Sequence, residues 1–341
     1  MLNVDRYTAA DRTAVEELFR RVRGAEAADA VLQRWEWQYE QNPALDGRDP
    51  LIWLLRCDGD VIGQYATMPV RLSISGREID AAWGMDVMIL PEHQGKGLGR
   101  LLFETWDRHV GASIGLGLTD ASHSLFKKLQ WPDMGRVPRL VKRLSPRALN
   151  APERPLDRAL RTARSAVATW RPLSADVREI QRFDDRVTRL WERVGGRFAF
   201  AVRRDATYLN WKLCDAPHVT YTIAAVHRGD EMRGYAAIRH AEQQGMRVMI
   251  LADFLADPDD PDALRLLLRW VERHAFAANA DVIRVFVTHE VFTNTMIAAG
   301  YVTGPATLRL VAKINALDLP SAYYGSSSDW HVTIGDSDVD R

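Results

Sequence analysis

The sequence has few cysteines and no long uncharged apolar run. Of its 341 residues only Cys57 and Cys214 are cysteine, and they lie far apart in the chain. Two cysteines cannot form the disulfide framework of a small secreted domain, and no cysteine and histidine cluster has zinc-ligand spacing. No apolar run is long enough to span a bilayer, and residues 1–6 do not resemble a secretory signal. We therefore expect a cytoplasmic protein without a metal site.

The sequence also lacks an excess of charge of either sign. Lysine plus arginine and aspartate plus glutamate both number 45, so the formal net charge is zero. An electrostatic attraction of the whole chain to nucleic acid or to an anionic membrane is therefore not expected. The length is natural for two domains of ordinary size, and the apolar content of 47% is that of a globular protein.

One stretch combines a strand, a glycine-rich loop and a helix. The apolar run Val87–Leu90 ends at Pro91, glycines alternate with other residues from 95 to 99, and helical spacing begins at Leu101. Such a loop leaves backbone N–H groups unpaired at the positive end of a helix dipole, which suits a phosphate. Glycine allows a tight turn and a close approach by the ligand.

The spacing of the glycines distinguishes between phosphate ligands. The dinucleotide fingerprint and the Walker loop both fail, because the last glycine interval is too short and Lys96 is followed by glycine. The run Gln94-Gly95-Lys96-Gly97-Leu98-Gly99, led by Pro91-Glu92-His93, resembles the acetyl-CoA signature of the GNAT superfamily of N-acetyltransferases. The alternative is a glycine-rich turn that binds nothing.

This resemblance implies acetyl-CoA as the co-substrate and no metal. The loop residues would hold the pyrophosphate, the strand before them would contact the thioester, and a helix residue would line the same site. The implied cofactor contacts are Met88, Ile89, Leu90, Gln94, Gly95, Lys96, Gly97, Leu98, Gly99, Arg100 and Phe126.

The order of the expected elements supports the resemblance over roughly the first 140 residues. Two helical stretches precede three strands that turn at residues 58–60 and 75–76, and the third strand leads into the loop. In this family the next strand, here 113–118, splays away and the pantetheine arm enters the gap. The following helix, 121–129, carries Phe126 where the family has the tyrosine that protonates the leaving thiolate. Because phenylalanine has no proton to give, we expect the thiolate either to take its proton from water or to leave as the anion.

The transfer also requires a group that accepts a proton from the amine. Asp86 is the nearest acid on the expected CoA strand and is our candidate base, with a hydrogen-bonded structural aspartate as the alternative. His123 and Asp120 are weaker candidates, and Glu92 and His93 are interpreted as structural.

The second half resembles an altered copy of the first. Trp37-x5-Pro43 is echoed by Trp211-x5-Pro217, and a strand expected at 246–255 leads into a loop at 257–261 with three aspartates and two prolines. Carboxylates would repel a pyrophosphate. We expect an α/β fold with two tandem modules, each a mixed, mostly antiparallel twisted sheet flanked by helices. The boundaries are 1–145 for the CoA-binding catalytic module, 146–178 for a connector rich in proline and arginine, and 179–341 for a degenerate module with a polar tail.

The acceptor is expected to be a primary amine of a small molecule. An amino sugar is one candidate, with aromatic residues 35, 37 and 39 (Trp35, Trp37 and Tyr39) as a stacking wall. A small amine, an amino acid or an aminoglycoside fits nearly as well, and core packing is the alternative for the three aromatic residues. The alternative function is a non-catalytic CoA-binding sensor or scaffold. Asp336, Asp338 and Asp340 are expected to form a solvated acidic end rather than a cation site.

Overall fold

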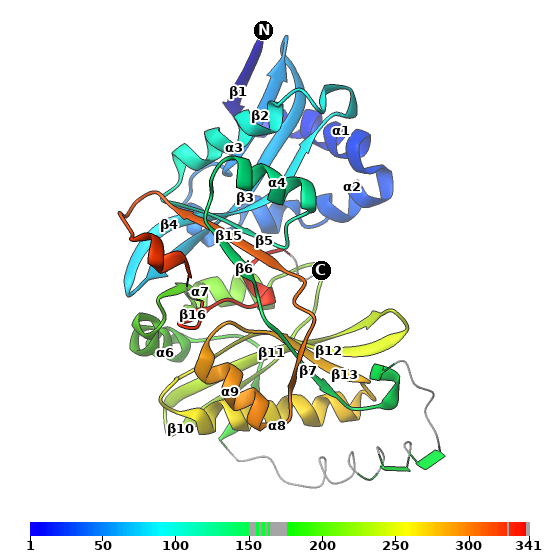
Figure 1. Ribbon diagram of the computed structural model, residues 1–341, viewed down its shortest axis with the longest axis vertical. Helices are drawn as coiled ribbons and strands as arrows, with labels where there is room; N and C mark the ends of the chain where they lie inside the picture. The colour runs from blue at the N-terminus through cyan, green and yellow to red at the C-terminus, as the bar shows by residue number, and fades with distance from the viewer. Residues whose placement is uncertain (150–154, 157–158, 161–162, 164–175, 326, 339–341) are drawn as a thin grey trace.

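The computed structural model describes residues 1–149, 155–156, 159–160, 163, 176–325 and 327–338. Within these residues the chain forms two mixed sheets that lie one above the other in Figure 1, each flanked by helices. The expected α/β fold with two mixed sheets is confirmed. Most of the connector expected at 146–178 lies outside the described residues.

The first sheet has nine strands among the described residues, in the order β1-β2-β3-β4-β5-β15-β6, with β9 paired to β3 and β16 to β9. All of these pairs are antiparallel except β4–β5 and β9–β16. The strands are β1 (Leu2–Arg6), β2 (Ile52–Cys57), β3 (Asp60–Ile74), β4 (Arg77–Ile89), β5 (Ala112–Leu116), β6 (Asp133–Arg136), β9 (Phe200–Val202), β15 (Arg309–Ile314) and β16 (Trp330–His331).

The second sheet has seven strands in the described part of the chain, in the order β14-β7-β13-β12-β11-β10-β8, and its parallel pair is β12–β13. The strands are β7 (Arg139–Arg143), β8 (Val177–Ile180), β10 (Thr222–Arg228), β11 (Glu231–Gln243), β12 (Met246–Ala256), β13 (Val282–Phe286) and β14 (Val302–Gly304). Each sheet therefore contains three consecutive antiparallel strands followed by one parallel strand, as the proposed repeat requires.

The helices cover these sheets with amphipathic faces. In α1 the buried residues Val15, Leu18 and Phe19 recur at intervals of three and one, which places them on one helical face. Nothing among the described helices is both long and apolar enough to cross a lipid bilayer. The helices are α1 (Arg12–Arg23), α2 (Ala25–Leu32), α3 (Leu98–His109), α4 (Asp120–Lys128), α6 (Asp185–Val194), α7 (Ala206–Leu209), α8 (Pro261–Ala277) and α9 (Glu290–Ala298), with single π-helical turns η2 (Glu36–Glu40) and η7 (Asn210–Cys214).

Two tight hairpins set the register of the first sheet. Asp58 and Gly59 join β2 to β3, and Ser75 and Gly76 join β3 to β4, all with positive φ between 50° and 98°. Two consecutive residues with positive φ form the type I′ turn, whose twist matches that of the flanking strands. The hairpin expected at residues 58–60 and the turn at 75–76 are therefore confirmed.

The two sheets exchange strands with each other. After α4 the chain adds β6 to the first sheet and then passes into the second sheet as β7, which pairs with β13. In return, β15 leaves the second half and pairs with β5 in the first sheet (Figure 1). The sheets therefore do not follow the expected division at residues 145 and 179. Local patterns could not indicate the exchange, because strand partners are chosen by tertiary packing.

A reciprocal contact between tryptophans joins the two halves. Trp37 of η2 donates its Nε1 hydrogen to the carbonyl of Trp211 at 2.7 Å, and Trp211 of η7 donates to the carbonyl of Trp37 at 2.8 Å. The two rings stack with centroids 5.1 Å apart. The repeated tryptophans of the sequence thus stack on each other and join η2 to η7.

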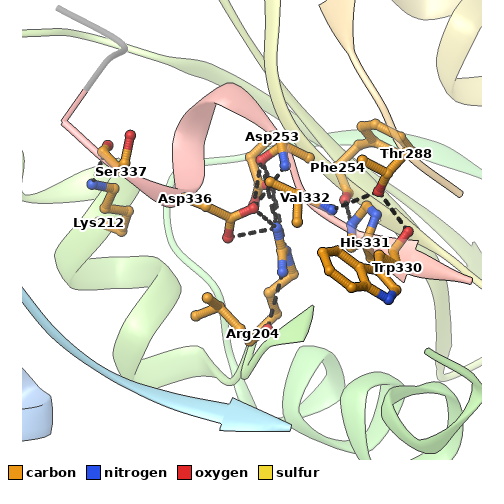
Figure 2. Close-up of polar contacts among 12 residues, drawn as sticks. Arg204, Lys212, Asp253, Phe254, Thr288, Trp330, His331, Val332, Asp336 and Ser337 are labelled. Atoms are coloured by element: carbon orange, nitrogen blue, oxygen red, sulfur yellow. Dashed lines mark hydrogen bonds and ion pairs between the residues drawn. The ribbon is translucent and has the colours of Figure 1, made fainter. Parts of the chain in front are cut away.

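The C-terminal segment is buried, and the prediction of a solvated acidic end is wrong for Asp336. Its carboxylate accepts hydrogen bonds of 2.9 Å from Nη2 of Arg204, which also bonds Asp253 of β12 at 3.0 Å (Figure 2). All three side chains are at least 94% buried. Burying a charge requires paired partners, so this cluster anchors the segment to the second sheet. Asp340 lies outside the described residues.

A buried histidine in the same segment predicts acid sensitivity. His331 donates from Nε2 to the carbonyl of Phe254 at 2.7 Å (Figure 2), and burial together with the charge of Arg204 lowers its pKa well below the ordinary value. The unfolded chain takes up this proton below about pH 6.5, whereas the folded protein does not. Stability should therefore be complete above that pH and fall as the pH decreases below it, by up to about 1.4 kcal/mol per pH unit for this group.

The measurement is the melting temperature between pH 7 and pH 5 for the wild type and His331→Gln, which keeps a donor but cannot titrate. We expect a smaller decrease in the variant. Identical slopes would contradict the assignment.

Candidate functional site

The parallel strands β4 and β5 pair briefly and then separate. Their ladder consists of Ala82 with Ser113 and Trp83 with Ile114. The next residues are Gly84 and Gly115, and from there the strands diverge around a pocket of about 440 Å³. The gap expected between the CoA strand and the next strand is therefore present, and it opens at a pair of glycines.

Both glycines are required by close neighbours. A side chain on Gly84 would collide with the hydroxyl of Tyr65, and a Cβ on Gly115 would lie 2.9 Å from Leu118 and 3.1 Å from Val311. Glycine in a strand marks such a close approach. The narrow end of the pocket is thus packed on both sides.

The pocket has an aromatic end and a polar rim. Its aromatic residues are Tyr65, Phe103 and Phe126. Its polar residues are Arg23, Asp86, Thr119, Ser122 and Asp338. On β4 it is lined by residues 84–87, whereas the predicted contacts Met88, Ile89 and Leu90 do not line it. The reason is that the ladder ends at Trp83, so the gap opens earlier on β4 than the sequence could indicate.

The predicted phosphate loop has an open backbone. Gly95 and Gly97 have φ of 75° and 77°, a conformation that favours glycine, and a Cβ at either position would meet no atom within 4 Å. Gly97 is the N-cap of α3, and no side chain caps the helix. The first N–H groups of α3 therefore have no side-chain acceptor, and the dipole favours an anion there.

The side chains of this loop are mostly directed elsewhere. Gln94 donates to the carbonyl of Ile89 at 2.8 Å, Arg100 pairs with Glu104 at 2.7 Å, and Lys96 is exposed. Leu98 and Gly99 are partly buried at the start of α3. The arrangement offers backbone groups to a ligand, with Lys96 as the nearest uncommitted cation among the loop residues.

Asp86 lines the pocket but has partners for both carboxylate oxygens. Arg23 donates to Oδ1 and Tyr39 donates to Oδ2, each at 2.8 Å, and Asp86 is 2% exposed. To act as a base, this carboxylate would have to exchange one of these hydrogen bonds for the substrate's proton. The structure thus brings the predicted base to the pocket and also shows what holds it in place.

The second sheet contains an equivalent of Asp86. Gly63 of β3 faces Ile89, and Gly234 of β11 faces Ala256. Asp86 lies three residues before Ile89 in β4, and Asp253 lies three residues before Ala256 in β12. Asp253 also accepts two hydrogen bonds, from Arg204 on Oδ1 at 3.0 Å and from Tyr235 on Oδ2 at 2.7 Å.

The same aspartate, arginine and tyrosine grouping therefore occurs in both halves, although the second half has no glycine loop. The arginine and tyrosine come from α1 and η2 in the first half but from the segment after β9 and from β11 in the second, so the shared feature is a buried aspartate whose two oxygens are both paired. Both aspartates are visible in the sequence, but only the strand register shows that they occupy equivalent positions.

The loop of the second half is neutralised by arginines. Asp257 and Asp260 both pair with Arg233, at 3.3 and 3.2 Å, and Arg197 binds Asp259 at 2.9 Å. The carboxylates of this loop are therefore paired with arginines of the same chain, and these arginines are not free to bind a pyrophosphate. No group of three or more histidine, cysteine, aspartate or glutamate residues in the described ranges is arranged to hold a metal ion.

The aromatic residues proposed as an acceptor wall belong to the core. Trp35 is fully buried, and its ring packs against Tyr39 with centroids 4.7 Å apart. Tyr39 is 1% exposed, and Trp37 is 6% exposed in the contact with Trp211. The interpretation as an open stacking wall is corrected to core packing, because the helical spacing of aromatic residues does not reveal which face is covered.

The weaker candidates for proton transfer are occupied or exposed. His123 bonds Asp133 through Nε2 at 2.7 Å and receives Arg309 on Nδ1 at 2.7 Å. Asp120 is exposed in the first turn of α4, and Glu92 pairs with Arg21 at the surface. None of these side chains lines the pocket.

The family assignment follows from these elements. Residues 3–113 match the family model of the acetyltransferase (GNAT) domain, a segment that runs from β1 into β5 and includes the glycine loop. The order of the strands and this match agree on a GNAT-type domain in the first part of the chain. Residues 3–113 therefore form a GNAT acetyltransferase domain, which lies in the first sheet. None of the curated proteins compared matches it in sequence.

Solved structures resemble the chain along nearly its whole length. N-myristoyltransferase of Saccharomyces cerevisiae with bound myristoyl-CoA has a TM-score of 0.58 at 13% identity, over 92% of this chain and 79% of that one. A probable N-acyltransferase of Enterococcus faecalis has 0.61 at 10%, over 93% and 73%. A GCN5-related N-acetyltransferase of Kribbella flavida has 0.61 at 14%, over 93% and 72%. These similarities show the fold of both sheets together.

The two equivalent aspartates should differ in their contribution to stability. Asp253→Asn leaves fully buried Arg204 with less charge compensation, so we expect the free energy of unfolding to fall by about 3–5 kcal/mol. Asp86→Asn leaves Arg23, whose side chain is 31% exposed and can reach water, so a smaller loss of about 1–3 kcal/mol is expected.

Denaturant unfolding checks this order, with Asp60→Asn at the exposed start of β3 as the control that should leave stability unchanged. An equal loss at both buried positions would show that solvent access of the arginine does not matter.

Proposed function

We propose that the protein transfers an acetyl group from acetyl-CoA to a primary amine of a small molecule in a ternary complex. The observation that carries the proposal is the position of the glycine loop, with the open N-terminus of α3, at the end of the strand that borders the gap. A pyrophosphate at that helix end and an acyl-pantetheine arm in the pocket would form one continuous ligand. We further propose that the site belongs to the first module and that the second module binds no CoA.

The chemistry requires few groups. The amine nitrogen attacks the thioester carbonyl carbon, the C–S bond breaks, and the sulfur leaves with the bonding electrons. The nitrogen loses one proton and the thiolate takes up one, so the reaction releases no net proton. Holding both substrates in one pocket supplies much of the acceleration, because it removes the entropy of the encounter.

The charges at the rim favour an amine over an anionic acceptor. Asp86 and Asp338 line the pocket together with Arg23, and Asp338 also pairs with Arg34, outside the pocket lining, at 4.0 Å. The two carboxylates would attract an ammonium group, and Asp86 remains our proposed proton acceptor. Because Trp35, Trp37 and Tyr39 are buried, they lend no support to an amino sugar in particular, so the proposed acceptor class is a small primary amine.

A second candidate function is a non-catalytic CoA-binding sensor or scaffold. Phe126 favours it, since this residue occupies the position of the family's tyrosine and cannot donate a proton. Both candidates require CoA binding, and only the enzyme releases thiol from acetyl-CoA in the presence of an amine.

Loss of the loop should abolish binding of acetyl-CoA. In the double variant Gly97→Glu plus Gly99→Glu, two carboxylates would lie at the helix end, so titration calorimetry should detect no binding where the wild type binds. Gly229→Glu, in a positive-φ turn of the second sheet, is the matched control for backbone strain and should bind normally. Absence of binding to the wild type would remove both candidate functions.

The role of Asp86 is tested by turnover. With a panel of primary amines, Asp86→Asn should bind acetyl-CoA as the wild type does but release thiol at least about 100-fold more slowly, the usual scale of acid–base assistance. Full activity of Asp86→Asn would leave this aspartate with only its structural role. Absence of thiol release by the wild type with every amine would favour the sensor or scaffold.

A further inference from the structure

A tyrosine that the sequence did not indicate reaches the narrow end of the pocket. Tyr65 extends from β3 beneath β4, and its hydroxyl lies against Gly84, the first residue after the β4–β5 ladder ends. Its ring is held firmly, stacked on Phe103 and edge-on to Trp106 with centroids 4.6 Å away in both cases. Only 2% of the residue is exposed, yet it lines the pocket.

The hydroxyl of Tyr65 has no hydrogen-bond partner among the described residues, which distinguishes it within the pocket. The other hydroxyls there, of Thr119 and Ser122, bond each other at 3.1 Å at the start of α4. A hydroxyl that lines a pocket without a protein partner keeps its hydrogen available to a ligand that brings an acceptor. Burial raises the pKa of Tyr65 well above its ordinary value, so the group keeps its proton at neutral pH.

Phe126 approaches the same place from the other side. Its ring is 3.7 Å from the Cβ position of Gly115 and meets Phe103 edge-on at 4.8 Å between centroids. Phe103 thus lies between Phe126 and Tyr65 and contacts both. Phe126 of α4 has no hydroxyl, but Tyr65 of β3 carries one on the other side of Phe103.

We propose that Tyr65 Oη donates a hydrogen bond to the sulfur of bound CoA and stabilises the thiolate as it leaves. This inference rests on the proposed function, in which the pantetheine arm occupies the gap. When the C–S bond breaks, the electron pair remains on sulfur and Tyr65 keeps its proton. The thiolate is protonated afterwards, and the proton lost by the amine balances it. A donor aimed at the atom where negative charge develops stabilises the transition state.

The test measures the thiol pKa of CoA bound to the protein, followed by the ultraviolet absorbance of the thiolate. It requires no acceptor amine. A hydrogen bond to the thiolate lowers this pKa, so Tyr65→Phe should raise it by about one unit, a tenfold change in ionisation. Tyr65→Phe keeps the ring and its stacking.

Two further variants make the test specific. Phe126→Tyr in the Tyr65→Phe background returns a hydroxyl from α4 and should lower the thiol pKa again. Tyr301→Phe removes a buried hydroxyl without a partner in the second half, far from the pocket lining, and should change nothing. With an active amine, Tyr65→Phe should lower kcat at least about tenfold and leave KM for acetyl-CoA unchanged.

Equal thiol pKa values in the wild type and Tyr65→Phe would overturn this inference while leaving the proposed function intact. A raised pKa that Phe126→Tyr reverses would support it. Failure of CoA to bind to the wild type would overturn the proposed function, and this inference with it.

Discussion

The separation of β4 from β5 is the constraint on which the rest of the structure depends. Two neighbouring strands that part leave backbone groups unpaired, and each strand must then be held from its other side. For β4 this support is β3, its neighbour in sequence. For β5 it is β15, which pairs with residues 112–116 and comes from the last tenth of the chain. The pocket of the first half therefore cannot be completed without the second half.

The second half repeats this architecture with different side chains. Its parallel pair β12–β13 is supported in turn by β7, a strand supplied by the first half. Where the first half has glycines 95 and 97 and an open helix end, the second has Asp257, Asp259 and Asp260 bound to arginines. The same fold thus carries one loop whose helix end has no side-chain cap and one loop whose carboxylates are paired within the chain.

Local features were predicted well because their causes are local. The alternating glycines and the turns at residues 58–60 and 75–76 act within a few residues, and each was found where expected. The roles of Trp35 and Asp336 were not predictable, since a tryptophan on a helix or an aspartate near the chain end acquires its surroundings from distant segments. Tyr65 escaped notice for the same reason: its significance depends on Gly84, which lies across a β-bulge on another strand.

The sequence by itself determined the type of fold, the position of the glycine loop and the loss of the tyrosine at Phe126, because spacing and residue type carry this information. Tertiary structure decided where the gap opens, which strands close it, and which polar groups face it. These depend on pairing between segments as distant as β5 and β15, and on burial that turns an exposed-looking Asp336 into the partner of Arg204. Sequence patterns record the preferences of a segment, whereas a pocket is formed by the segments that pack around it.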